Sequence, residues 1–285
     1  MSKRIVSVLV VAALGLVACG GDSDSPAGGD SLPPVVDGYQ HPTGADDVVI
    51  EYAEVGGFVP REFAFQQTPN VLISGDGQSF SPGAQIEIYP GPLLPAVQVQ
   101  SITEEGIQAI LAAADEAGLL QQVDYEQPTD IADASTAQVT INVNGDTFVH
   151  SAYALGLAFP GKGSQETTPE RQVLADFIAQ LSDLTGVVGA DQIVEQTIFE
   201  PSDYGIEAVV IDDLSAYGTD GIEPTVVDWP TGASVRLSDA ATCTVVPAAE
   251  VGELLATANQ LTFFTDADVT YQVLAKPILP GTTCA

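Results

Sequence analysis

Basic side chains are the scarcest charged groups in this sequence. Only 7 of its 285 residues are Lys or Arg, against 39 Asp or Glu, so the net charge is −32 at pH 7. Charged residues make up 16% of the chain, and its acidity therefore comes from missing Lys and Arg more than from a surplus of carboxylates. Proteins hold phosphate backbones through Lys and Arg. The composition therefore argues against nucleic acid as a partner.

Histidine and the familiar catalytic motifs are scarce as well. The chain has 2 His, and the HExxH, Walker A and complete GxGxxG patterns do not occur in it. His150 lies in an extended run without a recognised nucleophile context, so we expect a hydrogen-bonded strand residue there rather than a catalytic one. Too few nitrogen and sulfur ligands remain for a zinc site. We predict a protein that is not an enzyme and uses no cofactor.

The apolar run near the N-terminus is too short to cross a membrane as a mature helix. Residues 5–18 are apolar and follow Lys3 and Arg4, whereas a membrane-spanning helix needs about 20 apolar residues. A basic start followed by a short apolar run is typical of a signal peptide. We expect one over residues 1–18.

Residues 16–20, Leu-Val-Ala-Cys-Gly, resemble the lipobox of bacterial lipoproteins. The resemblance implies cleavage before Cys19 and a lipid on its sulfur, which anchors an exported protein to the extracytoplasmic side of the cell membrane. An ordinary secretory leader with an incidental Cys19 is the alternative. Cleavage leaves 5 basic against 39 acidic side chains, a net charge of −34. Since anionic headgroups repel such a surface, the lipid is the expected membrane contact.

The remaining chain divides into a tether and two folded blocks. Residues 19–47 are rich in Gly, Ser, Asp and Pro, a composition that predicts a disordered tether. Residues 48–186 are expected to form an α+β unit. Residues 187–285 are expected to form a β-rich block with one helix, which either stands alone or completes a single domain.

Hydrophobic periodicity and turn residues predict an α+β fold of antiparallel sheets with three amphipathic helices. One helix starts after Thr103 and stops at Gly118, a second starts at Thr168-Pro169 and ends at Gly186, and a third opens at Pro247. The expected strands are 48–52, 71–74, 78–80, 86–89, 138–143, 146–153, 195–199, 206–211, 225–227, 234–237 and 270–279.

The two cysteines outside the lipobox predict a disulfide. Cys243 and Cys284 form a pair in an exported chain, where oxidised cysteines are the default. The bridge closes a loop of about 40 residues and contributes about 3–4 kcal/mol in the chain-entropy model. A metal or redox site is the alternative, but CxxC spacing and a nearby His are both missing.

Two apolar features form a candidate binding surface. The Pro-rich stretch at residues 89–95 reads as a stiff apolar loop, with Tyr89, Pro92, Leu93 and Leu94 as candidate contacts. Trp229 is the chain's 1 Trp and a candidate binding platform. The competing interpretation is that the loop folds onto the sheet and that Trp229 packs in the core.

The acidic residues after the strand expected at 206–211 are weak calcium candidates. Asp212 and Asp213 lie close in sequence to Asp220 and Glu223, and Ca²⁺ prefers several oxygen ligands. The spacing does not match an EF-hand. A solvated acidic loop without metal is the favoured interpretation.

Residues 48–184 resemble the emfourin-type inhibitors of thermolysin-like metalloproteases. The similarity consists of a strand before Gly56-Gly57-Phe58, a helix, the hairpin at residues 138–153 and a closing helix after Thr168-Pro169. The resemblance implies a secreted-protease inhibitor. Our first prediction is nevertheless a membrane-anchored, non-enzymatic binding or scaffolding protein of the cell envelope with a protein or small-molecule partner. A carboxylate- or calcium-dependent hydrolase is the remaining alternative.

Overall fold

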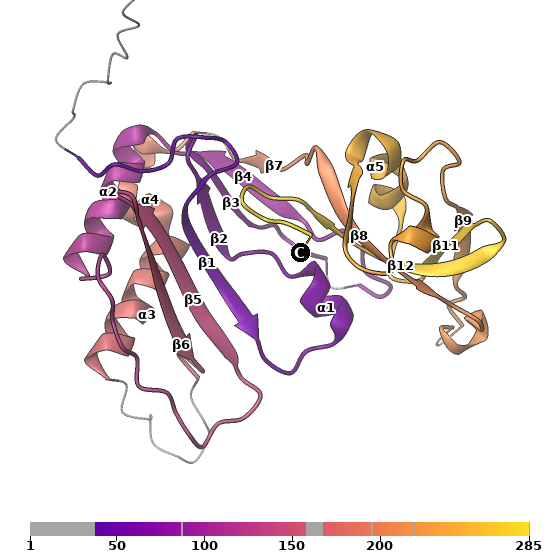
Figure 1. Ribbon diagram of the computed structural model, residues 1–285, viewed down its shortest axis with the longest axis horizontal. Coiled ribbons are helices and arrows are strands. Elements are labelled where there is room, and N and C mark those ends of the chain that lie inside the picture. Colours follow the sequence, from indigo (N-terminus) through magenta and orange to yellow (C-terminus); the bar gives the residue numbers. More distant parts are fainter. Residues whose placement is uncertain (1–37, 87, 158–167, 195, 219–220, 285) are drawn as a thin grey trace, which may run out of the picture. The chain divides into compact units, whose positions relative to one another are not determined.

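The computed structural model describes residues 38–86, 88–157, 168–194, 196–218 and 221–284, which belong to one compact unit beginning at Gly38. Within these residues the predicted α+β class is confirmed, with five α-helices and two mainly antiparallel sheets (Figure 1). None of the described helices has the length and apolar character needed to cross a bilayer. The expected signal peptide, Cys19 and the tether up to residue 37 lie outside the described residues.

The first sheet has seven strands in the order β6-β5-β1-β2-β3-β4-β7. Its hairpins follow the turn residues, because Asn144 and Gly145 both adopt the positive φ angles that a tight two-residue turn requires. The strands are β1 (Val48–Gly56), β2 (Val71–Ser74), β3 (Gln78–Pro82), β4 (Val97–Ser101), β5 (Ser135–Val143), β6 (Asp146–Tyr153) and β7 (Thr197–Ile198).

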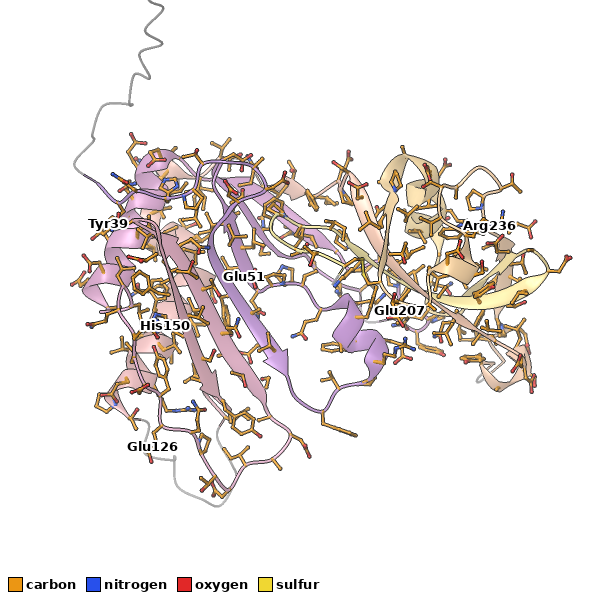
Figure 2. The ribbon with its side chains drawn as sticks, in the orientation of Figure 1. Tyr39, Glu51, Glu126, His150, Glu207 and Arg236 are labelled. Carbon is orange, nitrogen blue, oxygen red and sulfur yellow. A yellow bond between two sulfur atoms is a disulfide. The ribbon has the colours of Figure 1, made fainter. Side chains whose placement is uncertain are left out.

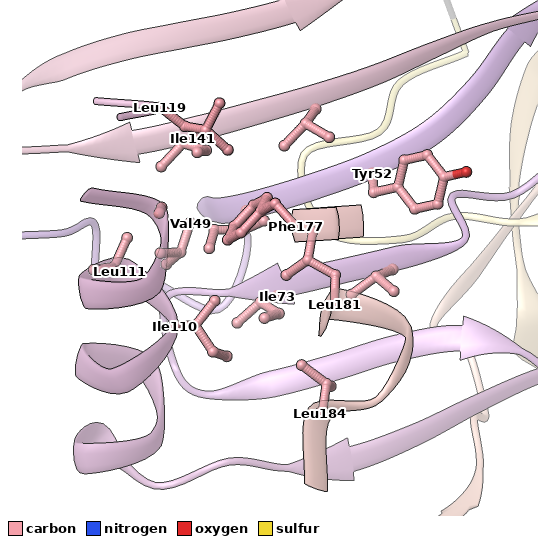
Figure 3. Packing of buried hydrophobic residues seen from close by; sticks show 14 of the residues in the cluster. Val49, Tyr52, Ile73, Ile110, Leu111, Leu119, Ile141, Phe177, Leu181 and Leu184 are labelled. Atoms are coloured by element: carbon pink, nitrogen blue, oxygen red, sulfur yellow. The ribbon is translucent and has the colours of Figure 1, made fainter. Parts of the chain in front are cut away.

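Three helices cover one face of this sheet (Figure 1): α2 (Glu104–Glu116), α3 (Pro169–Ser182) and α4 (Leu184–Val188). The main core lies between them and the sheet, where Ile110, Leu111 and Phe177 meet Ile141 (Figure 3). Every second residue of β5 from Ala137 onward is buried against the helices, so the intervening residues face the other way. We call that other side the second face.

The predicted helix ends are confirmed at four of five positions, including Pro247, which is the N-cap residue of the helix over Ala248–Thr257. The Thr103 hydroxyl accepts a hydrogen bond from the Gly106 amide, and Thr168 caps α3 in the same way. At Gly118 the chain turns with a φ of 69°, and the following amide of Leu119 bonds back to the helix, as in a Schellman motif. The expected end at Gly186 is wrong, because α3 stops at Ser182 and Asp183 caps the separate helix α4.

The second sheet has five strands in the order β10-β8-β12-β11-β9, of which β9 runs parallel to β11. It packs against α5 (Ala248–Thr257) around a second core. The strands are β8 (Asp203–Val210), β9 (Thr225–Asp228), β10 (Thr244–Pro247), β11 (Thr262–Asp266) and β12 (Val269–Pro277). The strands expected at 86–89 and 234–237 are wrong for their described residues, which are irregular or, at Leu237, in a 3-10 helix. β4, β10 and β11 were not predicted.

The end of the expected tether is held to the folded part of the chain by hydrogen bonds. Tyr39 exchanges hydrogen bonds with Gln108 on α2, and His41 contacts Glu104 on the same helix. The Asn144 amide donates to the Gln40 carbonyl at 2.6 Å. The prediction of disorder is therefore wrong for residues 38–47, whose contacts come from distant residues that the composition of the segment does not reveal.

Candidate functional site

The structure does not bring the predicted binding-surface residues together on an exposed surface. Trp229 is only 3% exposed, lies edge-to-face on Phe264, and donates its indole N–H to the Val235 carbonyl at 2.9 Å. Leu93 is 4% exposed in the same core. The binding-platform interpretation is wrong for these two side chains, because both fill the core between the second sheet and α5.

The Pro-rich loop contacts the second half of the chain. The Leu93 amide donates to the Ala258 carbonyl at 3.0 Å, and Gly91 exchanges hydrogen bonds with Gln260. Leu94 is half-buried against the second core, whereas Tyr89 and Pro92 stay exposed. This loop therefore joins β3 and β4 of the first sheet to the second sheet, which favours the competing interpretation of a connection folded onto the protein.

The disulfide between Cys243 and Cys284 is present, with the two Cα atoms 5.0 Å apart. It joins the segment before β10 to the segment after β12, the two strands that lie on either side of β8 in the sheet. Gly205 of β8 lies beneath it, since a Cβ there would come within 2.9 Å of the Cys284 sulfur. Glycine at this position makes room for the bridge.

The calcium candidates do not form a metal site in the part of the chain that the structure describes. No group of three or more His, Cys, Asp or Glu among those residues is arranged to hold a metal ion. The Asp213 carboxylate instead accepts hydrogen bonds from the amide and hydroxyl of Ser215, which lower its pKa. Asp212 and Glu223 do not form a metal-binding group with Asp213, and Asp220 lies outside the described residues.

His150 is a hydrogen-bonded strand residue, as predicted. It is 1% exposed on the helix-covered face, where its Nε2 lies 2.8 Å from the Leu119 carbonyl and its Nδ1 lies 2.8 Å from the Tyr125 hydroxyl. Since a carbonyl only accepts, Nε2 carries the proton and Nδ1 accepts from Tyr125. Burial lowers the pKa of His150 and so favours this neutral form.

Among the described residues, the most exposed aromatic side chain lies in the segment that begins at the end of β1. We call residues 55–63 the apolar loop, because it presents Val55, Phe58, Val59 and Phe63, of which Phe58 is 89% exposed. Gly56 and Gly57 direct the chain outward with φ angles of 72° and 84°, which other residues rarely adopt. The Phe58 amide then bonds to the Asp133 carbonyl at 3.1 Å, which fixes the base of the loop.

The short helix α1 (Arg61–Gln66) begins within this loop and is held against the second sheet. Arg61 pairs with the buried carboxylate of Glu207 on β8, and the Lys276 ammonium lies 5.1 Å from the centre of the Phe65 ring. The Gln66 side chain also donates to the Leu93 carbonyl at 2.5 Å. The apolar loop is therefore supported at both ends although its own side chains are exposed.

A pocket of about 420 Å³ lies between this segment and β1. Its wall combines apolar groups of Ala53, Val55 and Val59 with polar groups of Gln67 and Thr282. Glu51 of β1 also lines it, and pairing with Thr140 of β5 places Glu51 on the second face of the sheet (Figure 2). Burial raises the pKa of Glu51 above its ordinary value.

The carboxylate of Glu51 has no hydrogen-bond or ion-pair partner among the described residues. The basic side chains described by the structure are already engaged: Arg61 with Glu207, Arg171 with the carbonyls of Glu126 and Tyr153, Arg236 with Asp266, and Lys276 with Phe65. The pocket thus presents a half-buried, unpaired negative charge beside an apolar wall.

This pocket was not predicted, and Gly56-Gly57-Phe58 stood out in the sequence only through a family resemblance. The glycine pair before an aromatic was the available signal, whereas Glu51 carries no mark that separates it from the other acidic residues. Comparison with protein families, curated proteins and solved structures finds no match to this chain.

Proposed function

We propose that this protein is an exported, lipid-anchored, non-enzymatic binding protein of the cell envelope, and that the apolar loop is its contact with a partner. The observation that carries the proposal is the 89% exposure of Phe58 on a loop whose two ends are fixed. When a partner removes a large aromatic side chain from water, the free energy falls, which favours binding. A loop that is already supported loses little conformational entropy on binding.

Site-specific photocrosslinking tests the contact. A photoreactive amino acid replaces Phe58 in the full-length protein in its own cells, and a second version carries it at Val173, which is 38% exposed on the helix layer. We expect a discrete crosslinked species from position 58 and none of that mass from position 173. Identical products from both positions, or no product from position 58, would overturn the proposed contact.

The Cys19→Ala substitution tests the anchor. The lipobox resemblance and the short apolar run support lipidation, since two or three acyl chains hold a protein stably at a membrane. We expect Cys19→Ala to abolish incorporation of radiolabelled fatty acid and to release the protein from the membrane fraction. A variant that still incorporates label and sediments with membranes would contradict the proposal.

A secreted-protease inhibitor is the second candidate, because exposed Phe58 lies directly after the glycine pair of the emfourin resemblance. An aromatic side chain on a supported loop suits insertion into an apolar pocket of a protease. The non-lipidated Cys19→Ala protein is titrated against thermolysin-like proteases, with Phe58→Ala beside it. Inhibition that Phe58→Ala weakens would support this candidate, and no inhibition at micromolar excess would remove it.

A further inference from the structure

We infer that the pocket at Glu51 binds a Lys or Arg side chain of a polypeptide partner, with the partner's neighbouring apolar residues lying on the apolar loop. This inference rests on the proposed function and adds the chemistry of the partner. It combines an open pocket, an unpaired acidic group and an apolar wall, formed by described residues of β1 and the segment after it together with Thr282.

The position of Glu51 makes it different from the acids on the molecular surface. Its neighbours across the sheet are Thr140 on β5 and Leu72 on β2, and Leu72 is fully buried in a small core on the second face. Neither neighbour supplies a positive charge. A carboxylate that is partly removed from water interacts more strongly with an incoming cation than an exposed one, and salt screens the interaction less.

The protein itself offers no cation to this carboxylate within the residues that the structure describes. Arg61 is the basic side chain of the segment that forms the pocket wall, and it pairs with Glu207 instead. The overall charge of −32 attracts a basic partner from a distance. Charge complementarity therefore selects a cationic occupant, and the half-buried position selects one that can enter a pocket.

The apolar wall distinguishes a polypeptide from a simple cation. Val55 and Val59 line the pocket, and exposed Phe58 lies next to Val59 in the chain. A Lys or Arg side chain offers both a charged end for Glu51 and a methylene stem for this wall. Apolar residues beside it in the partner would cover Phe58, which a lone ammonium ion cannot do.

Peptide titration tests the inference with defined probes. The ¹⁵N-labelled Cys19→Ala protein is titrated with acetyl-Leu-Lys-Leu-amide, its Arg and Gln counterparts, and n-butylammonium, while amide shifts of β1 and the apolar loop are followed by NMR. We expect saturable shifts with the Lys and Arg peptides, and binding at least about tenfold weaker with the Gln peptide and with butylammonium. Each tenfold step corresponds to about 1.4 kcal/mol of binding free energy.

The matched variants are Glu51→Gln and Glu253→Gln, which remove the same charge at the pocket and at an exposed position of α5. We expect Glu51→Gln to lower the affinity for the Lys peptide at least about tenfold. Glu253→Gln should change that affinity less than about twofold. Equal weakening by both variants, unchanged binding by Glu51→Gln, or butylammonium binding as tight as the peptide would overturn the inference. If the inference fails but the crosslink from position 58 forms, the proposed function still stands. If position 58 gives no crosslink, the proposed function itself is overturned.

Discussion

On the helix-covered face of the first sheet, the buried imidazole of His150 uses both ring nitrogens in hydrogen bonds. On the second face, the half-buried carboxylate of Glu51 has no partner among the described residues. The Glu51 carboxylate keeps some contact with water, but its partial burial makes the ionised form less favourable than at an exposed site. The comparison therefore assigns the first face to stability and leaves the second face, with the adjoining apolar loop, as the surface that we propose for binding.

Substitution of two phenylalanines gives the largest expected difference in the free energy of unfolding. Phe177 is 1% exposed in the main core, so Phe177→Ala should lower the free energy of unfolding by about 3–5 kcal/mol through lost burial and a new cavity. Phe58→Ala should change it by less than about 0.5 kcal/mol, because the ring is already in water. Urea denaturation of both variants measures the difference. A comparable loss in Phe58→Ala would mean that Phe58 packs within the protein and is not held free for a partner.

Substitution of two adjacent residues of β6 gives the next largest difference in stability. His150→Leu removes the partner of the Leu119 carbonyl and of the Tyr125 hydroxyl, and should cost about 2 kcal/mol. Ser151→Ala is the control, since Ser151 lies on the second face and its hydroxyl makes no hydrogen bond to the described part of the chain. It should cost less than about 0.5 kcal/mol. Equal losses, measured by thermal and urea unfolding, would contradict the division between the two faces.

The pH dependence of stability sharpens the same comparison. Burial lowers the pKa of His150 in the folded state, so the unfolded state binds more protons below about pH 6.5. Stability from neutral His150 is complete above that pH and is lost as the pH falls toward the folded-state pKa. We expect the difference between wild type and His150→Leu to shrink by up to about 1.4 kcal/mol per pH unit. A difference that stays constant between pH 7 and pH 5 would show that His150 is not held neutral.

The structural features that could be predicted from the sequence are local ones. Thr103 starts α2, Asn144-Gly145 turns the β5–β6 hairpin, and the pattern around His150 indicated a strand residue. Each of these signals depends on residues that are neighbours in the chain. Local chemistry was therefore sufficient for these elements of the first sheet, but it did not reveal β4.

The parts that were missed depend on distant contacts. Leu93 looked like an exposed loop residue because its burial comes from Ala258 and the second core, more than 100 positions away in the sequence. β10 and β11 are strands of four and five residues, too short to show a clear period. Glu51 is set apart by its neighbours Leu72 and Thr140, which only strand pairing brings beside it.

Glu51→Gln has the smallest expected effect on the free energy of unfolding, and it tests directly whether the charge at Glu51 is unpaired. Burial raises the pKa of this carboxyl in the folded state, so its ionised form opposes folding, and stability is lost as the pH rises through the folded-state pKa. Glu51→Gln removes that cost and should raise the free energy of unfolding at pH 7 by less than about 1 kcal/mol, since solvent still screens the group. The gain should shrink as the pH falls and the wild-type carboxyl takes up a proton. Destabilisation by Glu51→Gln at pH 7 would mean that the carboxylate already has a stabilising partner, and the second face would then resemble the first.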